Sequence, residues 1–222
     1  NNNIEIAKLL LQKEECDINL LELNDNVKKN ALRIAVEKGF KEMVQVLISN
    51  PKTEINYIYK DEKNALSIAI EKEDIDIIKI LLSREDIDVN YQLKDKHLIS
   101  NAKTYIVEKT ALSMAIDIGN IEIMKLLLEN NNININYMIK EYNENKISYK
   151  YIKKKKPLNN TQKSSKEIIK RKTYLHYAVI NQKCNIISLL LDHGIDINKK
   201  DAAKYYKLAS DNGDINSMNK YV

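Results

Sequence analysis

The residues in this chain that could do chemistry do not form a catalytic constellation. The three histidines, His97, His176 and His193, lie far apart in the sequence. The two cysteines, Cys16 and Cys184, form no CxxC motif and no Cys/His spacing. There is no phosphate-binding loop, zinc-binding helix motif, nucleophile elbow or kinase signature. We therefore expect no catalytic residues, no cofactor and no metal ion, and a chain that is not an enzyme.

Charged side chains are the remaining candidates, and their chemistry is binding. Three carboxylates recur at equivalent places in a repeated phrase described below: Glu37, Glu71 and Asp117. They could pair with the basic groups of a partner. A second set is basic, because residues 146–172 hold 11 Lys or Arg and one Glu, a net charge of +10. The whole chain carries only +5, so the remainder is acidic.

The basic segment allows three interpretations. It could be a solvated loop, a nuclear import signal, or a site for nucleic acid or an anionic membrane. The residues that would bind an anion are Lys153, Lys154, Lys155, Lys156, Lys170, Arg171 and Lys172.

The elements that position these residues come from a phrase that returns four times. It reads NALRIA at 30–35, NALSIA at 64–69, TALSMA at 110–115 and TYLHYA at 173–178. Each copy is followed by an apolar run and then by Ile or Val before an asparagine: Asn56, Asn90, Asn136 and Asn198. A period in the thirties predicts a stacked solenoid in which each repeat packs on its neighbours.

Each repeat is predicted to contain two helices. The first begins after a residue suited to cap it: Asn30, Asn64, Thr110 and Thr173. The second covers 41–48, 75–82, 121–128 and 185–191. Glycines mark a left-handed turn between the helices at Gly39, Gly119 and Gly213, and Gly194 follows a second helix. Glu73 and Gln182 stand at that turn in the other two repeats.

The most complete copy resembles an ankyrin repeat. TYLHYA at 173–178, the leucines at 189–191, His193-Gly194 and DIN at 196–198 are similar to the family motif T-P-L-H-x-A, a leucine run and G-A-D-V-N. The other copies lack the Pro and His, and Glu62 replaces the glycine usual at a hairpin tip. The resemblance covers about residues 1–200. It implies an all-α repeat solenoid, a helix-turn-helix stack with β-hairpin fingers and a concave groove.

The resemblance also implies protein recognition without intrinsic chemistry, and it suggests where a partner binds. The carboxylate row Glu37, Glu71 and Asp117 would face the groove, and His176 would support its own repeat by hydrogen bonds. One turn before the carboxylates lies an apolar row of Ile34, Ile68, Met114 and Tyr177. Finger candidates are Tyr57, Tyr59, Lys60, Asp61 and Glu62. The alternative is that the carboxylates are merely solvated and that the apolar row is partly core.

Two insertions, about 91–107 and 137–172, lengthen the spacing between repeats. The first is predicted to be a long hairpin, because apolar and polar residues alternate in it. The second is predicted to contain a turn at 143–145 and a helix start at 164–167. Residues 201–222 resemble the start of a Sel-like helical repeat, and the alternative is a degenerate ankyrin cap.

We therefore expect a scaffold for protein–protein interaction. The alternatives are a recognition or regulatory segment of a larger enzyme such as a kinase, or an anion-binding module acting through 146–172. No apolar run approaches the roughly 20 residues that span a bilayer. The sequence begins inside a repeat without an initiator Met, which suggests a segment of a longer chain. We expect this segment to be monomeric and intracellular, in the cytoplasm or nucleus.

Overall fold

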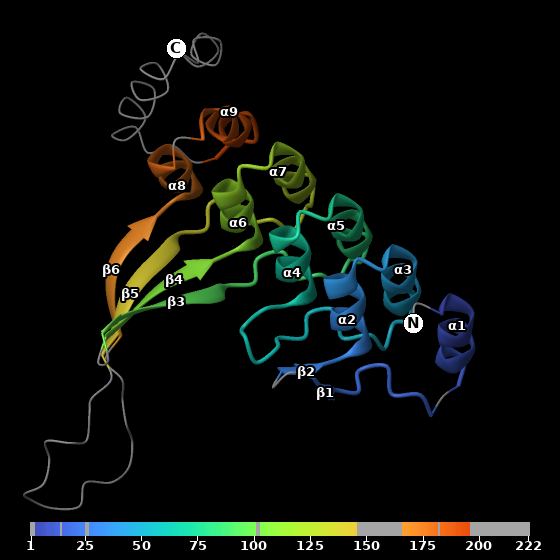
Figure 1. Cartoon of the computed structure of the whole chain (residues 1–222). Helices are drawn as coiled ribbons and strands as arrows, with labels where there is room; N and C mark the ends of the chain where they lie inside the picture. Colours follow the sequence, from blue (N-terminus) through green and yellow to red (C-terminus); the bar gives the residue numbers. More distant parts are fainter. Residues whose placement is uncertain are drawn as a thin grey trace, which may run out of the picture.

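The computed structural model describes residues 3–13, 15–24, 27–100, 103–145, 166–181 and 183–195. In them, short helices stack in two layers and strands project from one side (Figure 1). The inner layer, next to the strands, comprises α2 (Ala31–Lys38), α4 (Ala65–Glu71), α6 (Ala111–Ile118) and α8 (Tyr174–Ile180). The outer layer comprises α1 (Ile4–Leu11), α3 (Lys41–Ser49), α5 (Ile75–Leu82), α7 (Ile121–Leu128) and α9 (Cys184–Asp192). The predicted solenoid of helix pairs is confirmed.

Each inner helix begins where the capping residues predict. Their side-chain oxygens accept a hydrogen bond from the backbone N–H three residues on: Asn30, Asn64, Thr110 and Thr173. In the fourth repeat, Nδ1 of His176 also lies 2.7 Å from Oγ1 of Thr173. The imidazole therefore supports its own repeat, as the family resemblance implied.

The core runs along the stack and is not closed within any one repeat. The leucine and the last alanine of each copy of the repeated phrase are at most 2% exposed. The leucines are Leu32, Leu66, Leu112 and Leu175, and the alanines are Ala35, Ala69, Ala115 and Ala178. The alanines permit the inner helices to approach closely, while the leucines fill the space between them. Burial therefore depends on the neighbouring repeat, as expected for a solenoid.

In three of the described repeats, the asparagine that follows an Ile or Val joins one repeat to the next. Nδ2 of Asn56 donates to the carbonyl of Asp86 (2.6 Å), and its Oδ1 accepts from the N–H of Asp88 (2.8 Å). Asn19 and Asn90 make the same pair of bonds to the turns of the repeats that follow them. One side-chain amide thus satisfies two backbone groups of its neighbour, which gives the recurring asparagine a structural role.

Left-handed backbone occurs at the predicted turns. The glycines there are Gly39 (φ 71°), Gly119 (φ 81°) and Gly194 (φ 75°). Glu73 adopts φ 53° at the turn between α4 and α5, so it is strained where its counterparts are glycine. Two further turn residues, Gln182 and Gly213, lie outside the described residues.

The fingers differ in length. β1 (Glu22–Asn24) and β2 (Val27–Lys29) form a short hairpin, whereas 57–63 is a tight turn without assigned strands. In that turn the N–H of Tyr59 donates to the carbonyl of Lys63. The first insertion is a long hairpin of β3 (Leu93–Ser100) and β4 (Lys103–Lys109), as predicted.

The second insertion corrects two predictions. β5 (Ile139–Asn145) continues through 143–145, where a turn was expected, and β6 (Lys166–Lys172) begins where a helix start was expected. Both strands join the first insertion in one antiparallel sheet ordered β3-β4-β5-β6 (Figure 1). The reason is the edge of β4, whose free backbone groups pair with residues of β5 that lie 34 to 42 positions later in the sequence.

At the N-terminal end, α1 has no buried residue, and Ile6, Leu9 and Leu10 are about half exposed. Residues 201–222 lie outside the described residues, so the Sel-like interpretation stays a prediction. No described helix is long and apolar enough to cross a membrane.

Replacing Asn56 with alanine should lower the free energy of unfolding by about 1–2 kcal/mol. The change removes two hydrogen bonds that link neighbouring repeats, each worth about 1 kcal/mol. Urea unfolding measures the loss. Gln92→Ala is the matched control, because this exposed side-chain amide makes no hydrogen bond to another described residue. An equal effect of both changes would contradict the role assigned to Asn56.

Opposite substitutions at equivalent turns should have opposite effects. Glu73→Gly relieves a left-handed conformation and should raise the free energy of unfolding by about 1 kcal/mol. Gly39→Ala should lower it by a similar amount, since an added Cβ meets only Asp74 Oδ2 at an ordinary 3.7 Å and the cost is backbone strain. Thermal unfolding of both variants checks this, and effects of the same sign would refute it.

A candidate partner-binding groove

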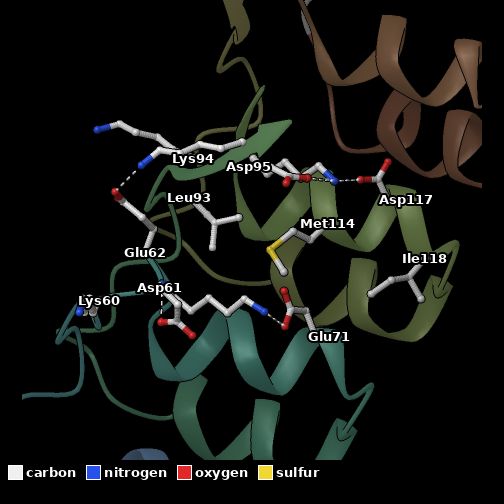
Figure 2. A pocket seen from close by; sticks show the side chains of 13 residues that line it. Lys60, Asp61, Glu62, Glu71, Leu93, Lys94, Asp95, Met114, Asp117 and Ile118 are labelled. Atoms are coloured by element: carbon white, nitrogen blue, oxygen red, sulfur yellow. Dashed lines mark hydrogen bonds and ion pairs between the residues drawn. The ribbon is translucent and has the colours of Figure 1, made fainter. Parts of the chain in front are cut away.

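A hollow of about 560 Å³ lies where the turn at 60–63 and the start of β3 meet α4 and α6. Figure 2 shows these side chains converging from the turn, the strand and the two helices. The lining comprises Lys60, Asp61, Glu62, Lys63, Glu71, Leu93, Lys94, Asp95, Lys96, Lys109, Met114, Asp117 and Ile118. Six of them were predicted to bind a partner: Lys60, Asp61, Glu62, Glu71, Met114 and Asp117. We call this hollow the groove pocket.

Next to the groove pocket, a buried arginine on α2 holds the finger formed by the turn at 57–63. The Arg33 side chain is 6% exposed and makes two hydrogen bonds to Asp61 (2.8 and 2.7 Å) and one from Nε to Glu37 (2.7 Å). It also lies 4.5 Å from the centre of the Tyr59 ring. The hydrogen bond to Asp61 is the largest cause of a raised Arg33 pKa and of a lowered Asp61 pKa. Asp61 therefore anchors its finger and is not a free binding group.

Before three of the four inner helices, α2, α4 and α6, a lysine pairs with the carboxylate eight residues later. The pairs are Lys29–Glu37 (2.7 Å), Lys63–Glu71 (2.6 Å) and Lys109–Asp117 (3.0 Å). Burial opposes ionisation of Glu37, but hydrogen bonds from Lys29 and Arg33 outweigh it and lower the pKa. The predicted carboxylate row does lie along the inner helices. It is already neutralised by this chain, so it is not the free row that was expected to attract a basic partner.

The third pair extends into a cluster that holds the sheet against α6. Lys109 also bonds Asp95 on β3 (2.9 Å), and the two carboxylates raise its pKa although burial opposes this (Figure 2). Tyr177 on α8 is half-buried and hydrogen-bonds Asp117. Burial is the first cause of its raised pKa, followed by that hydrogen bond. The sheet and the inner helices thus share a fixed polar contact.

Several predicted binding residues belong to the core instead. Tyr59 is only 3% exposed, and its hydroxyl donates to Oδ1 of Asn30 in the preceding repeat. Ile68 and Met114 are 5% and 7% exposed, so only a small part of each can touch a partner. Ile34, Tyr57 and Tyr177 are half-buried. For Ile68 and Met114, the central members of the apolar row, burial therefore favours the alternative interpretation, in which the row is partly core between repeats.

The groups left to bind a partner in the groove pocket are cations. Lys60 is exposed and Lys94 half-buried, and neither has an ion-pair partner among the described residues. Within the described ranges Lys96 pairs only with Glu62, at 3.1 Å, with the two side chains 47% and 36% exposed. A pair so exposed contributes about 0–1 kcal/mol and is easily exchanged for another carboxylate. The groove pocket therefore suits an acidic segment better than a basic one.

The basic segment offers less for anion binding than the sequence indicated. Lys172 bonds Oε1 of Glu141, which is almost fully buried, so its charge is used within the sheet. Lys170 and Arg171 lie on β6. Four further candidates, Lys153, Lys154, Lys155 and Lys156, fall outside the described residues.

Sequence reasoning missed four residues that organise this site: Arg33, Lys63, Lys94 and Lys109. A signal existed for three of them. Arg33 precedes Glu37 by four residues, the spacing of a helical ion pair, and the lysine-to-carboxylate spacing of eight recurs in three repeats. Lys94 had no such signal, because the alternation that predicted its hairpin does not show which residues of the hairpin lie beside α4 and α6. No group of three or more His, Cys, Asp or Glu suited to a metal occurs among the described residues.

Comparison with known proteins agrees with this architecture. The family model described as "Ankyrin repeats (3 copies)" matches residues 1–95, 60–139 and 93–201. The crystal structure of EF0377, an ankyrin repeat protein, matches with a TM-score of 0.56 over 94% of this chain and 90% of that one. At 18% identity, this likeness concerns the fold alone. A sequence search of curated proteins finds no match.

Replacing Arg33 with methionine should lower the free energy of unfolding at pH 7 by about 2–4 kcal/mol, since two carboxylates lose their buried partner. The pKa values of Asp61 and Glu37 are lowered in the folded state. Their contribution is therefore present above about pH 4 and lost as the pH falls through the folded-state values.

Urea unfolding between pH 7 and pH 3 measures this difference. The difference in the free energy of unfolding between the parent protein and Arg33→Met should become smaller in acid. Lys125→Met, on the outer helix α7, is the control and should change stability little at any pH. A difference in the free energy of unfolding that stays constant from pH 7 to pH 3 would mean that the two carboxylates do not stabilise the fold through Arg33.

Proposed function

The chain belongs to the ankyrin repeat family, and we propose that it is a non-enzymatic module that binds an acidic segment of another protein in the groove pocket. Ankyrin repeats generally mediate protein–protein interaction. The observation that carries the finer proposal is the pair of lysines, Lys60 and Lys94, for which the described part of the chain offers no ion-pair partner beside an otherwise neutralised site.

The surroundings of these lysines favour binding over simple solvation. The turn that carries Lys60 is held by Arg33, and the strand that carries Lys94 is held to α6 through Asp95 and Lys109. A preorganised site loses less conformational entropy when it binds. Leu93, Met114 and Ile118 add apolar lining beside the charges, as in the centre of many interfaces. The intracellular location and the monomeric state stay predictions.

Selection from a random peptide library displayed on phage tests this function without knowledge of the partner. Peptides enriched on the parent protein should be rich in Asp and Glu. The double variant Lys60→Glu/Lys94→Glu should bind the selected peptides at least about tenfold more weakly, a change of about 1.4 kcal/mol. Fluorescence anisotropy with the labelled peptides gives the Kd values.

Lys125→Glu is the matched control, because it reverses one exposed lysine on the outer helix α7. It should leave the Kd within about twofold. Enrichment of basic peptides, or equal weakening by the control and the groove variant, would contradict the proposed site.

A further inference from the structure

We propose that the free edge of β3 receives the acidic segment as an added β-strand, so that backbone hydrogen bonds as well as charges hold the partner. This inference rests on the proposed function and specifies its geometry. The bound segment would be extended, with carboxylates at alternate positions and apolar side chains between them.

The first observation is the open edge. β3 pairs with β4 along one side, from Leu93 opposite Lys109 to Ser100 opposite Lys103. On its other side, none of its backbone groups makes a hydrogen bond to another backbone group of the described residues. Figure 1 shows β3 at the border of the sheet, on the side of α4. Such an edge presents a row of N–H and C=O groups to which an extended peptide can pair.

The second observation is the space beside that edge. The groove pocket is lined by the turn at 60–63 and by residues 93–96 at the start of β3. An added strand lies about 4.8 Å from its neighbour, so it would enter this hollow. The open edge of β3 and the groove pocket are therefore one site.

The third observation is the distribution of side chains. Successive residues of a strand point to opposite faces, so Lys94 and Lys96 share one face and Leu93 shares the other with Asp95. Asp95 reaches Lys109, which also bonds Asp117 on α6, so its face is the one toward the inner helices. A strand added beside β3 would place alternate side chains near the lysines and the others near Leu93 and Met114. This is the reason for an alternating acidic and apolar segment.

The Glu62 carboxylate already pairs with Lys96, one of the two lysines that a partner's carboxylates would approach. The carboxylate bonds Lys96 at 3.1 Å, and the Glu62 carbonyl accepts from the Tyr91 hydroxyl at 2.9 Å. A carboxylate from a partner would replace the first contact at little cost, because the pair is exposed. The second contact can stay, because it keeps the turn beside the strand without using the β3 backbone.

An opposing account of the same lysines is that they protect the edge. Lysines on edge strands discourage the pairing of one sheet with another. That account predicts no affinity for acidic extended peptides, whereas strand addition predicts that the same lysines select them.

A synthetic peptide in which glutamate alternates with valine over seven residues tests the inference on the full chain. Two further versions carry N-methyl groups, one on every glutamate and the other on every valine. In an added strand only one alternating set of N–H groups faces β3. One version should therefore lose at least tenfold in affinity, while the other stays within about twofold of the parent peptide. Hydrogen exchange of the β3 amides should slow when the parent peptide binds.

The outcomes separate this inference from the proposed function. If both methylated peptides bind like the parent peptide, or if the β3 amides are not slowed, the segment docks through side chains alone and strand addition is wrong. If acidic peptides from the library bind but the alternating peptide does not, strand addition is again wrong while the proposed function stands. If no acidic peptide binds, both fail, and the lysines protect the edge.

Discussion

The packing of each inner helix on the next, through one leucine and one alanine per repeat, is the contact on which the rest of the structure depends. Leu66 and Ala69 are buried in a helix, α4, that packs against α2 on one side and α6 on the other as well as against its own partner α5. The stack fixes where each finger leaves its repeat, and the asparagines that bridge neighbouring turns set the alignment on the far side. The groove pocket exists because two successive repeats are held at this spacing.

Charge in this protein mostly serves the fold. The recurring lysine-to-carboxylate pairs and the contacts of Arg33 neutralise the groove side of the inner helices one repeat at a time. These pairs leave Lys60 and Lys94 as the groups available to a partner in the groove pocket. The proposed binding site is thus marked by the charges that lack partners among the described residues, whereas a row of charges in the sequence is a poor guide to it.

The repeat could be predicted from the sequence because its signals are local. The capping residues, the glycine turns and the leucine and alanine positions all lie within one helix pair, and those among the described residues are confirmed. Tyr59 was mistaken for an exposed finger residue because its burial depends on Asn30 of the preceding repeat. The pairing of β4 with β5 was missed for a similar reason, since it joins insertions from different repeats. Lys94 lies in the hairpin that the sequence predicted, but its place beside α4 and α6 depends on how the repeats stack, so no local pattern marked it.

The most direct test of the account is to locate a library-selected acidic peptide on the protein. A nitroxide spin label at one end of the peptide broadens the NMR signals of amides near it. The account predicts broadening at residues 60–63 and 93–96, with the outer helices α5 and α7 unaffected. Broadening centred on the outer helices, or on the exposed apolar residues of α1, would contradict the claim that the unpaired lysines of the groove pocket form the binding site.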